Sequence, residues 1–403
     1  MSERRATLDA IHGWLIEAGL ANTSTPELLD GFSQRFVAAG VPLARVWFSN
    51  TGLHPERRAS TVVWQDGRII EQVSFGYAQM ETPTWLDSPF RYLMDRREPR
   101  MRRRLVGEHA VLDFVVLAEL REAGFTDWLA LLYGFGWAHE HRADDPLGLV
   151  TSWATRRAEG FDDGDLAAIE EMAGTLALAV KASTTSDTAR EVLATYLGRD
   201  PATRVIAGHV RRGAVGRMAA VILYADLRGF TDFTDVAPPE EVTRRLNAYF
   251  DCAGAAIATA GGEILKFLGD GILAVFLLPP GSDASVVAAA ALGASRMLLA
   301  GVAELNAVEM VAGHPPLPVD VVLHAGDVTY GNVGTSERLD FTVIGPVVNE
   351  AARLEALCKD LDRSLLVSDA FVRTAPALRR TLRSLGVHRL RGVREPREVF
   401  ALP

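Results

Sequence analysis

The chain has 403 residues, which is enough for two or three domains with separate hydrophobic cores. Its composition, 48% hydrophobic and 23% charged, is that of a folded globular protein, and a net charge of −9 gives no indication of nucleic acid or an anionic membrane surface as a partner. The two cysteines, Cys252 and Cys358, lack metal-ligand spacing, so we expect no zinc site, no disulfide framework and a reducing, cytoplasmic location.

The sequence also predicts no secretion signal and no membrane span. Residues 1–20 lack the apolar core and the small-residue cleavage site of a signal peptide. The longest weakly polar run, residues 284–305, is rich in alanine and contains Arg296. We therefore interpret this run as a buried helix.

Residues 1–185 predict an α+β domain. Apolar spacing and strand-forming residues indicate helices at both ends of this region and strands between them. The clearest of these elements lie over 26–40, 44–50, 60–67 and 163–182. The run from 147 to 182 resembles the closing strand, loop and final helix of a GAF domain. The resemblance implies a regulatory sensor domain that binds a small-molecule effector.

Residues 186–216 are predicted to connect two domains. The segment is polar and helix-prone at first and then rich in glycine and basic residues. A helix that leaves one domain can transmit a movement to the next, but a passive spacer would have the same composition. Both interpretations remain open on the sequence alone.

Residues 217–403 predict a second α+β domain with the ferredoxin-like order βαββαβ. A strand over 219–225 is followed by a helix, a hairpin around 266–276, an alanine-rich helix and a further strand. This order places helices on one face of an antiparallel sheet.

Two carboxylates in this second domain predict a metal site. Asp226 closes the first strand, and Asp270 lies at the hairpin turn 44 residues later. Hard cations such as Mg²⁺ and Mn²⁺ prefer oxygen ligands. The glycine-containing segment after Asp226 leads to a helix start at Phe230 and Thr231, where backbone N–H groups could cradle phosphates. Taken singly, either aspartate could also be a turn or capping residue.

Several motifs that follow one another in this half are more specific than any single residue. They are YADLRGFTDFTD, GGEILKFLGDGILAVF, HAGDVTYGNVG, DFTVIGPVVNEAARLE and LRGV. In this order they closely resemble the catalytic domain of class III adenylate cyclases. The resemblance implies that Asp226 and Asp270 hold two Mg²⁺ or Mn²⁺ ions in each site.

The same resemblance implies roles for further residues. Lys266 corresponds to the lysine that reads the adenine ring. Asn349 and Arg353, four residues apart on one helical face, correspond to the pair that orients the ribose and stabilises the transition state. Arg391 stands where the family usually has a phosphate-binding lysine, which keeps the charge but changes the donor geometry. Thr342 stands where many members have Asp, and it resembles the class IIIb subgroup.

These assignments imply an activity and a partner. ATP is expected over GTP, because Lys266 can donate to adenine N1 and Thr342 can accept from the exocyclic amine. The ribose 3′-hydroxyl would attack the α-phosphorus and expel pyrophosphate, which gives 3′,5′-cyclic AMP. In the family the catalytic domains pair head to tail, so a homodimer would build two sites from residues of both chains. The subgroup also implies stimulation by bicarbonate.

Other functions remain as alternatives. A pseudocyclase would keep the fold and act as a dimeric ligand-binding sensor, although the metal aspartates and the Asn349 and Arg353 pair are all present. A guanylate cyclase would usually carry Glu in place of Lys266. A diguanylate cyclase would need a GGDEF-type turn, whereas this chain has GGEIL before the hairpin strand and LGDG at the turn.

Weaker signals lie mainly in the N-terminal half. His139 and His141 could ligate a metal or haem, but solvated loop histidines are commoner. The seven arginines between residues 91 and 104 could bind an anion, but a solvated face or a salt-bridge network is the preferred interpretation. His324, in the second half, is interpreted as structural. Aromatic residues could line a pocket, with most of them expected in the core: Trp64, Phe75, Trp85, Trp128, Phe135 and Trp137.

Overall fold

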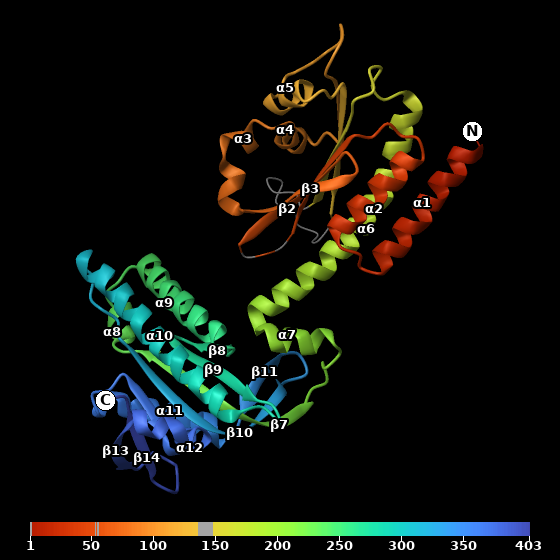
Figure 1. The fold of residues 1–403 in the computed structure, drawn as a ribbon. Coiled ribbons are helices and arrows are strands. Elements are labelled where there is room, and N and C mark those ends of the chain that lie inside the picture. Colours follow the sequence, from red (N-terminus) through yellow and green to blue (C-terminus); the bar gives the residue numbers. More distant parts are fainter. Residues whose placement is uncertain (1, 53, 55, 136–147) are drawn as a thin grey trace. The chain divides into compact units, whose positions relative to one another are not determined.

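A computed structural model describes residues 2–52, 54, 56–135 and 148–403 (Figure 1). The chain divides into two compact units, Met1–Val192 and Leu193–Pro403, which we call unit 1 and unit 2. Each unit has its own sheet and its own hydrophobic core.

Unit 1 is built on a six-stranded sheet in the order β3-β2-β1-β6-β5-β4, and every neighbouring pair is antiparallel. The strands are β1 (Arg45–Thr51), β2 (Arg57–Gln65), β3 (Arg68–Gly76), β4 (Arg100–Arg104), β5 (Asp127–Gly134) and β6 (Gly148–Thr155). The strands predicted over 44–50 and 60–67 are confirmed as β1 and β2, which pair from Arg45 opposite Gln65 to Thr51 opposite Ala59.

Helices cover both faces of this sheet (Figure 1). The main core lies under α1 (Ser2–Leu20), α2 (Thr25–Ala38) and α6 (Asp163–Leu197). A smaller core lies on the other face under α4 (Pro89–Arg96) and α5 (Val115–Glu122), next to η1 (Tyr77–Glu81) and α3 (Pro83–Leu86). The helix predicted over 26–40 is α2, which begins after Ser24, whose hydroxyl donates to Glu27.

The helix predicted over 163–182 is longer than expected. It continues through residues 183–197 as a single 35-residue helix, α6, and the boundary between the two units falls inside it. Residues 183–197 contain neither glycine nor proline, so nothing in this stretch ends the helix. It stops at Gly198, which has a φ of +93°, and α7 (Arg199–Ile206) follows.

Unit 2 has the predicted βαββαβ order at its centre. Its eight-stranded sheet runs β13-β14-β12-β10-β7-β9-β8, and β11 pairs with β10. The strands are β7 (Val215–Leu227), β8 (Glu263–Leu268), β9 (Gly271–Leu278), β10 (Val319–Gly334), β11 (Leu339–Ile344), β12 (Leu365–Ser368), β13 (Arg383–His388) and β14 (Arg397–Ala401). The four central strands β10, β7, β9 and β8 are antiparallel neighbours, as the ferredoxin-like prediction requires.

The helices of unit 2 pack on both sides of the sheet. Helices α9 (Pro239–Thr259) and α10 (Ala284–Val311) bury the largest core on one face. Helix α11 (Pro346–Asp360) packs on the other face. The short elements are α8 (Phe230–Thr234), α12 (Asp369–Thr374) and η2 (Pro376–Thr381).

Helix α10 contains the alanine-rich run. By length and composition it is the one helix in the described part of the chain that could cross a membrane. In the structure, one side of α10 packs into the core of unit 2, with Ala291, Ala294 and Leu298 fully buried. Cys358 is buried and Cys252 is partly buried, and both are free thiols.

Candidate active site

The two predicted metal ligands lie together in unit 2. Asp226 is the penultimate residue of β7, and Asp270 lies in the turn between β8 and β9. Strand β9 pairs with β7, which brings the turn to the end of β7. A side chain at Gly271 would have its Cβ 3.1 Å from Asp226 Oδ1, so glycine leaves room there for the carboxylate.

Asp226 and Asp270 lie in a partly buried environment where several carboxylates are close together. The pKa of Asp226 is raised to about 7, first by burial and then by the neighbouring carboxylates of Asp270 and Glu355. Glu355, on α11, likewise has a pKa raised by burial and by nearby carboxylates. We call Asp226, Asp270 and Glu355 the carboxylate cluster.

Two further residues border the carboxylate cluster. Asp320 lies directly opposite Asp226 in the pairing of β7 with β10 and is only 3% exposed. Arg228 neutralises it through a bidentate ion pair, with 3.0 Å between Nε and Oδ2. Neither Glu355 nor Asp320 stands out in the sequence, because only the pairing of β10 and the packing of α11 bring them to β7.

The carboxylate cluster fits a divalent cation. Its oxygen ligands suit Mg²⁺ or Mn²⁺, and a bound cation would favour the ionised form of Asp226, which burial and the neighbouring carboxylates disfavour. Asp226 and Asp270 are the residues that would hold the ions.

The helix start after β7 is also where it was predicted. Gly229 has a φ of +79° and turns the chain from β7 into α8, which begins at Phe230. The N–H groups of Phe230 and Thr231 are in the first turn of α8 and therefore have no acceptor within the helix. Thr231 is exposed and Phe230 is partly exposed.

Lys266 is held on the surface of β8 by a residue that the sequence did not single out. Its ammonium forms an ion pair with Asp340 on β11, and both side chains are a little under half exposed. Asp340 and Thr342 share one face of β11, because Phe341 and Val343 face the core. Lys266 and Thr342 therefore belong to one surface. Asp340 could have been found from the sequence, because side chains two residues apart on a strand lie on the same face and Asp340 is two residues before Thr342.

The predicted ribose and phosphate contacts line one groove. Asn349 and Arg353 from α11 and Arg391 from the loop between β13 and β14 border a groove of about 990 Å³, which we call the α11 groove. All three side chains are exposed, and none has a hydrogen bond or ion pair with another described residue. Two guanidinium groups and an amide make a surface that can bind phosphate and hydroxyl oxygens.

One chain does not bring the α11 groove to the carboxylate cluster. The groove is lined by neither Asp226 nor Asp270, and Lys266 is also outside it. Arg353 and Glu355 are two residues apart on α11, which places them about 200° apart around the helix. The predicted site residues thus do not line a single pocket within one chain.

A second cluster of potential metal ligands in unit 2 is already neutralised. Glu241, Glu309 and His314 lie within reach of a single ion. Arg244 pairs with both carboxylates and holds the pKa of Glu309 at about 2. Arg245 lies 3.8 Å from Glu309 as well, so two guanidinium groups face the two carboxylates and little charge remains for a cation to compensate.

The weaker predictions have mixed outcomes. His324 is structural, as expected: it is buried, its Nδ1 lies 2.7 Å from the Ser368 hydroxyl, and burial lowers its pKa. His139, His141 and Trp137 lie outside the described residues.

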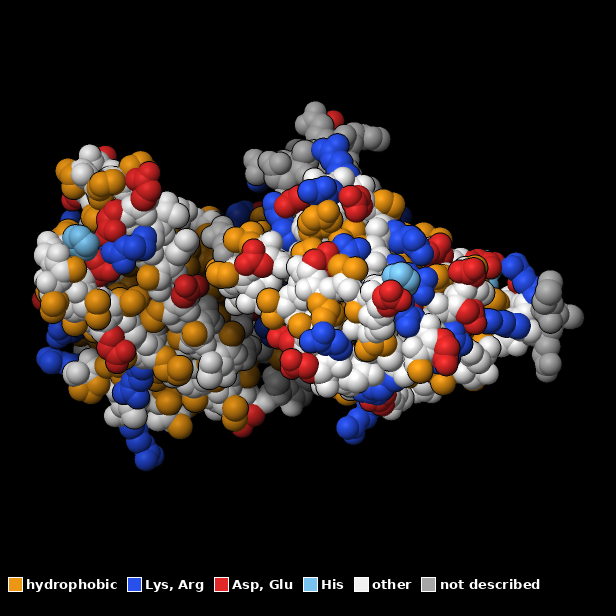
Figure 2. Space-filling view, turned by 90° about the horizontal axis from the view of Figure 1, so that it is seen from above, with side chains coloured by type: hydrophobic (Ala, Val, Ile, Leu, Met, Phe, Trp, Pro, Cys, Tyr) orange, Lys and Arg blue, Asp and Glu red, His pale blue; other side chains and the backbone are white. Residues whose placement is uncertain are grey.

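The arginine-rich segment of unit 1 forms a salt-bridge network. Arg102 and Arg104 both reach Asp127, which is fully buried. Arg103 pairs with Asp113 at 2.7 Å, and the remaining ion pairs of the segment join Arg91 to Asp95 and Arg100 to Glu170. Figure 2 shows acidic and basic side chains intermixed on the visible face of unit 1.

The aromatic residues of unit 1 divide between core and cavity. Trp64, Trp128 and Phe135 are buried in the cores, whereas Phe75 and Trp85 border a cavity of about 390 Å³ on the α3 and α4 side of the sheet. We call it the aromatic cavity. No charged side chain is among the described residues that line it.

A family model described as the adenylate and guanylate cyclase catalytic domain matches residues 216–401. Unit 2 therefore carries an adenylate and guanylate cyclase catalytic domain. This cyclase domain is 34% identical over 169 residues to the adenylate cyclase of Anabaena cylindrica, an alignment that covers 41% of this chain and 32% of that protein. It is 32% identical over 167 residues to adenylate cyclase 1 of Rhizobium meliloti, covering 41% of this chain and 24% of that protein.

Among solved structures, the cyclase domain is similar to the adenylyl cyclase CyaB from P. aeruginosa, at 26% identity and a TM-score of 0.43, over 47% of this chain and 95% of that one. The guanylyl cyclase Cya2 is similar at 29% identity and a TM-score of 0.41, over 46% and 92%. The chain spans a third or less of the length of the two curated relatives, and both adenylyl and guanylyl cyclases are among the similar structures.

Proposed function

We propose that this protein is an adenylate cyclase that converts ATP to 3′,5′-cyclic AMP and pyrophosphate in signal transduction. The observation that carries the proposal is the carboxylate cluster at the end of β7 in a cyclase catalytic domain, where burial and neighbouring carboxylates together raise the pKa of Asp226 to about 7. Bound Mg²⁺ or Mn²⁺ would lower the pKa of the ribose 3′-hydroxyl and bind the triphosphate oxygens.

The α11 groove supplies the complementary chemistry. Asn349 would orient the ribose by hydrogen bonds, and Arg353 would neutralise the charge that develops on the α-phosphate oxygens. Arg391 and the free N–H groups at Phe230 and Thr231 would bind phosphate oxygens. The reaction displaces pyrophosphate directly by the 3′-oxygen, so no covalent enzyme intermediate is needed.

Base recognition is assigned to the β8 and β11 surface. Lys266 would donate to adenine N1, and the Thr342 hydroxyl would accept from the 6-amino group. A guanylate cyclase is the second candidate, because the O6 of guanine could also accept from Lys266.

We propose that the active form is a homodimer with two equivalent sites. Its support is the separation within one chain of the carboxylate cluster from the α11 groove. In a head-to-tail dimer Asp226 and Asp270 of one chain would meet Lys266, Thr342, Asn349, Arg353 and Arg391 of the other. A monomer would then be inactive.

Regulation is assigned to unit 1. We propose a GAF-like sensor domain over residues 1–185 that takes a small-molecule effector, a connector over 186–216, a catalytic domain over 217–403 and a cytoplasmic location. Because Thr342 resembles the class IIIb subgroup, we also propose that bicarbonate stimulates the activity. An activity that does not respond to bicarbonate at fixed pH would refute that last point.

The test is product formation by the purified full-length chain with Mn²⁺ or Mg²⁺, with ATP and GTP supplied separately and products identified by mass. Cyclic AMP from ATP is expected, and the Asp226→Ala variant is the matched control. Cyclic GMP alone would make the protein a guanylate cyclase. No cyclic product from either nucleotide would favour a pseudocyclase that acts as a ligand-binding sensor.

A further inference from the structure

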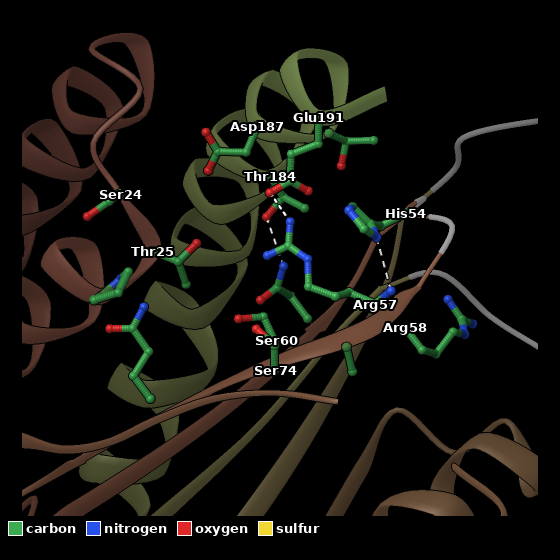
Figure 3. A pocket seen from close by; sticks show the side chains of 16 residues that line it. Ser24, Thr25, His54, Arg57, Arg58, Ser60, Ser74, Thr184, Asp187 and Glu191 are labelled. Atoms are coloured by element: carbon green, nitrogen blue, oxygen red, sulfur yellow. Dashed lines mark hydrogen bonds and ion pairs between the residues drawn. The ribbon is translucent and has the colours of Figure 1, made fainter. Parts of the chain in front are cut away.

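Unit 1 contains a second cavity that differs in chemistry from the aromatic cavity. It has a volume of about 470 Å³ and lies between the start of α2, the ends of β1 to β3 and the last part of α6 in unit 1 (Figure 3). We call it the polar cavity. Its volume is within the range of small-molecule binding sites.

The lining of the polar cavity is hydrophilic. Among the described residues that border it, only Pro26 and Ala59 have apolar side chains, and there is no Phe, Tyr or Trp. Hydroxyl and amide groups come from the start of α2, from the strands and from α6, including Thr25, Ser60 and Gln72. Such a lining does not suit a ligand with a large apolar part.

Charges of both signs face this cavity from opposite walls. Arg57 extends from β2 and forms an ion pair with Glu191 of α6. Asp187, one turn earlier on α6, has only a loose pair with Arg190, at 3.6 Å between two side chains that are each more than half exposed. In Figure 3 Asp187 and Glu191 project from α6 above Arg57. Arg58 borders the cavity as well and is 4% exposed.

Buried polar groups complete the cavity wall. Asn50 on β1 donates to the Thr184 hydroxyl at 3.1 Å, and both residues are buried. Thr188, one turn further along α6, is 7% exposed, and its hydroxyl has no hydrogen bond to another described residue. A hydroxyl that opens onto a cavity and has no protein partner is available to a ligand.

We propose that the polar cavity binds a free α-amino acid with a small or polar side chain. Its carboxylate would bind on the arginine wall of β2, and its ammonium group would bind Asp187 and Glu191 on the α6 wall. The hydroxyl of Thr188 and the groups at the start of α2 would bind the remaining polar atoms. A zwitterion can exchange the Arg57–Glu191 ion pair for contacts to its own carboxylate and ammonium group, which neither a simple anion nor a simple cation can do.

The position on α6 connects this site to the regulatory role proposed for unit 1, and in this respect the inference rests on the proposed function. Thr184, Asp187, Thr188 and Glu191 are spaced by three, four and seven residues and so share one face of the helix. The same helix continues past Val192 to Leu197, within unit 2. A bound amino acid would therefore contact the helix that runs into the cyclase domain.

Binding is tested by isothermal titration calorimetry on the full-length protein, with the common L-amino acids added one at a time to about 10 mM. We expect saturable binding of at least one small or polar amino acid, with one site per chain. For that amino acid, the amine without the carboxylate and the N-acetyl derivative without the ammonium group should each bind at least about tenfold more weakly, because each loses a charge-assisted contact.

Two isosteric substitutions locate the site. Asp187→Asn and Thr188→Val should weaken binding about fivefold or more, while thermal unfolding stays unchanged. Phe75→Leu in the aromatic cavity is the matched control and should leave binding intact. Calorimetry does not depend on turnover, so a protein without cyclase activity could still confirm this site.

Three results would overturn the inference. They are the absence of saturable binding for every amino acid, binding that survives both α6 substitutions, and a glucose or glycerol affinity above that of any amino acid. Binding that is lost only in Phe75→Leu would move the ligand to the aromatic cavity and equally contradict the proposal.

Discussion

A buried carboxylate is paired with arginines in unit 1, whereas a partly buried carboxylate of unit 2 lies beside other carboxylates. In unit 1, Arg102 and Arg104 converge on the fully buried Asp127, whose Oδ2 also accepts from the Phe161 backbone N–H at 2.9 Å. In unit 2, Asp226 lies beside further carboxylates, and Arg353 has no carboxylate partner among the described residues. Paired charges thus mark structural positions, whereas like charges held together and unpartnered guanidinium groups mark positions prepared for a ligand.

The same contrast exists inside unit 2. The Glu241, Glu309 and His314 cluster is balanced by Arg244 and Arg245, and the hydrogen bond from Arg244 lowers the pKa of Glu309 to about 2. The carboxylate cluster contains Asp226, whose pKa is near 7. By the closeness of their carboxylates alone, both clusters could be metal sites. The ion pairs with Arg244 distinguish the first cluster from the second.

The largest expected effect is on catalysis. Asp226→Ala and Arg353→Ala should each reduce turnover by about a thousandfold or more, because the first removes a metal ligand and the second removes the guanidinium that neutralises charge on the reacting phosphate. Mixing the two variants should restore about a quarter of the wild-type activity per chain, since half the dimers are mixed and each mixed dimer has one intact site. Cyclic AMP formation by separate and mixed variants is the measurement.

Two controls make this mixing experiment decisive. Arg353→Ala should leave thermal unfolding within about 1 °C of wild type, because the side chain is exposed and has no partner among the described residues. Dimer formation in the mixture must be shown by mass measurement. Dimers that form without recovering activity would contradict shared sites.

A comparable substitution in the paired network should affect stability instead. Asp127→Ala would leave two arginines and a buried N–H without their acceptor, at a cost of about 3 kcal/mol, which corresponds to a fall of about 10 °C in Tm. Scanning calorimetry of the full-length chain measures this. Asp127→Asn keeps one acceptor oxygen, so its Tm should lie between those of the wild type and Asp127→Ala. An unchanged Tm for Asp127→Ala would contradict the structural role of this ion pair and with it the contrast between the units.

An intermediate effect concerns metal affinity and pH. The pKa of Asp226 is raised from 3.8 to about 7, so below pH 7 its carboxyl keeps a proton that a metal must displace. Mn²⁺ should therefore bind about tenfold more tightly at pH 8 than at pH 6. Electron paramagnetic resonance of free Mn²⁺ follows the binding. Asp226→Asn should flatten this dependence, and equal affinities in the wild type would show that Asp226 is not a ligand.

The smallest effects are expected at the base-reading surface. Lys266→Glu should lower the preference for ATP over GTP, measured as the ratio of kcat/KM for the two nucleotides. Asp340→Asn removes the partner that holds the Lys266 ammonium and should change KM for ATP by no more than about fivefold, because the pair is partly exposed. An unchanged nucleotide preference in Lys266→Glu would remove Lys266 from base recognition.

Local patterns in the sequence were sufficient for most elements and for the identity of several candidate residues. Strands β1 and β2 and helix α2 follow from alternating or helical spacing of apolar residues. The βαββαβ order follows from the alternation of strand and helix patterns after residue 217. Asp226, Lys266, Asp270, Asn349 and Arg353 were found through ordered motifs, which depend on sequence alone.

Residues whose role depends on distant neighbours were not found. Glu355 and Asp320 reach Asp226 only through the packing of α11 and the pairing of β10, and Asp340 reaches Lys266 across two strands. The length of α6 was also underestimated, because its polar continuation resembles a linker until one sees that no residue before Gly198 stops the helix.

The sequence by itself determined most helices and strands, the cyclase motifs and the arginine-rich segment, since periodicity and motif spacing are local properties. Only the tertiary structure decided which charges are balanced and which remain available for a ligand. That distinction depends on burial and on side chains brought together from separate parts of the chain, as in the carboxylate cluster, the α11 groove and the polar cavity.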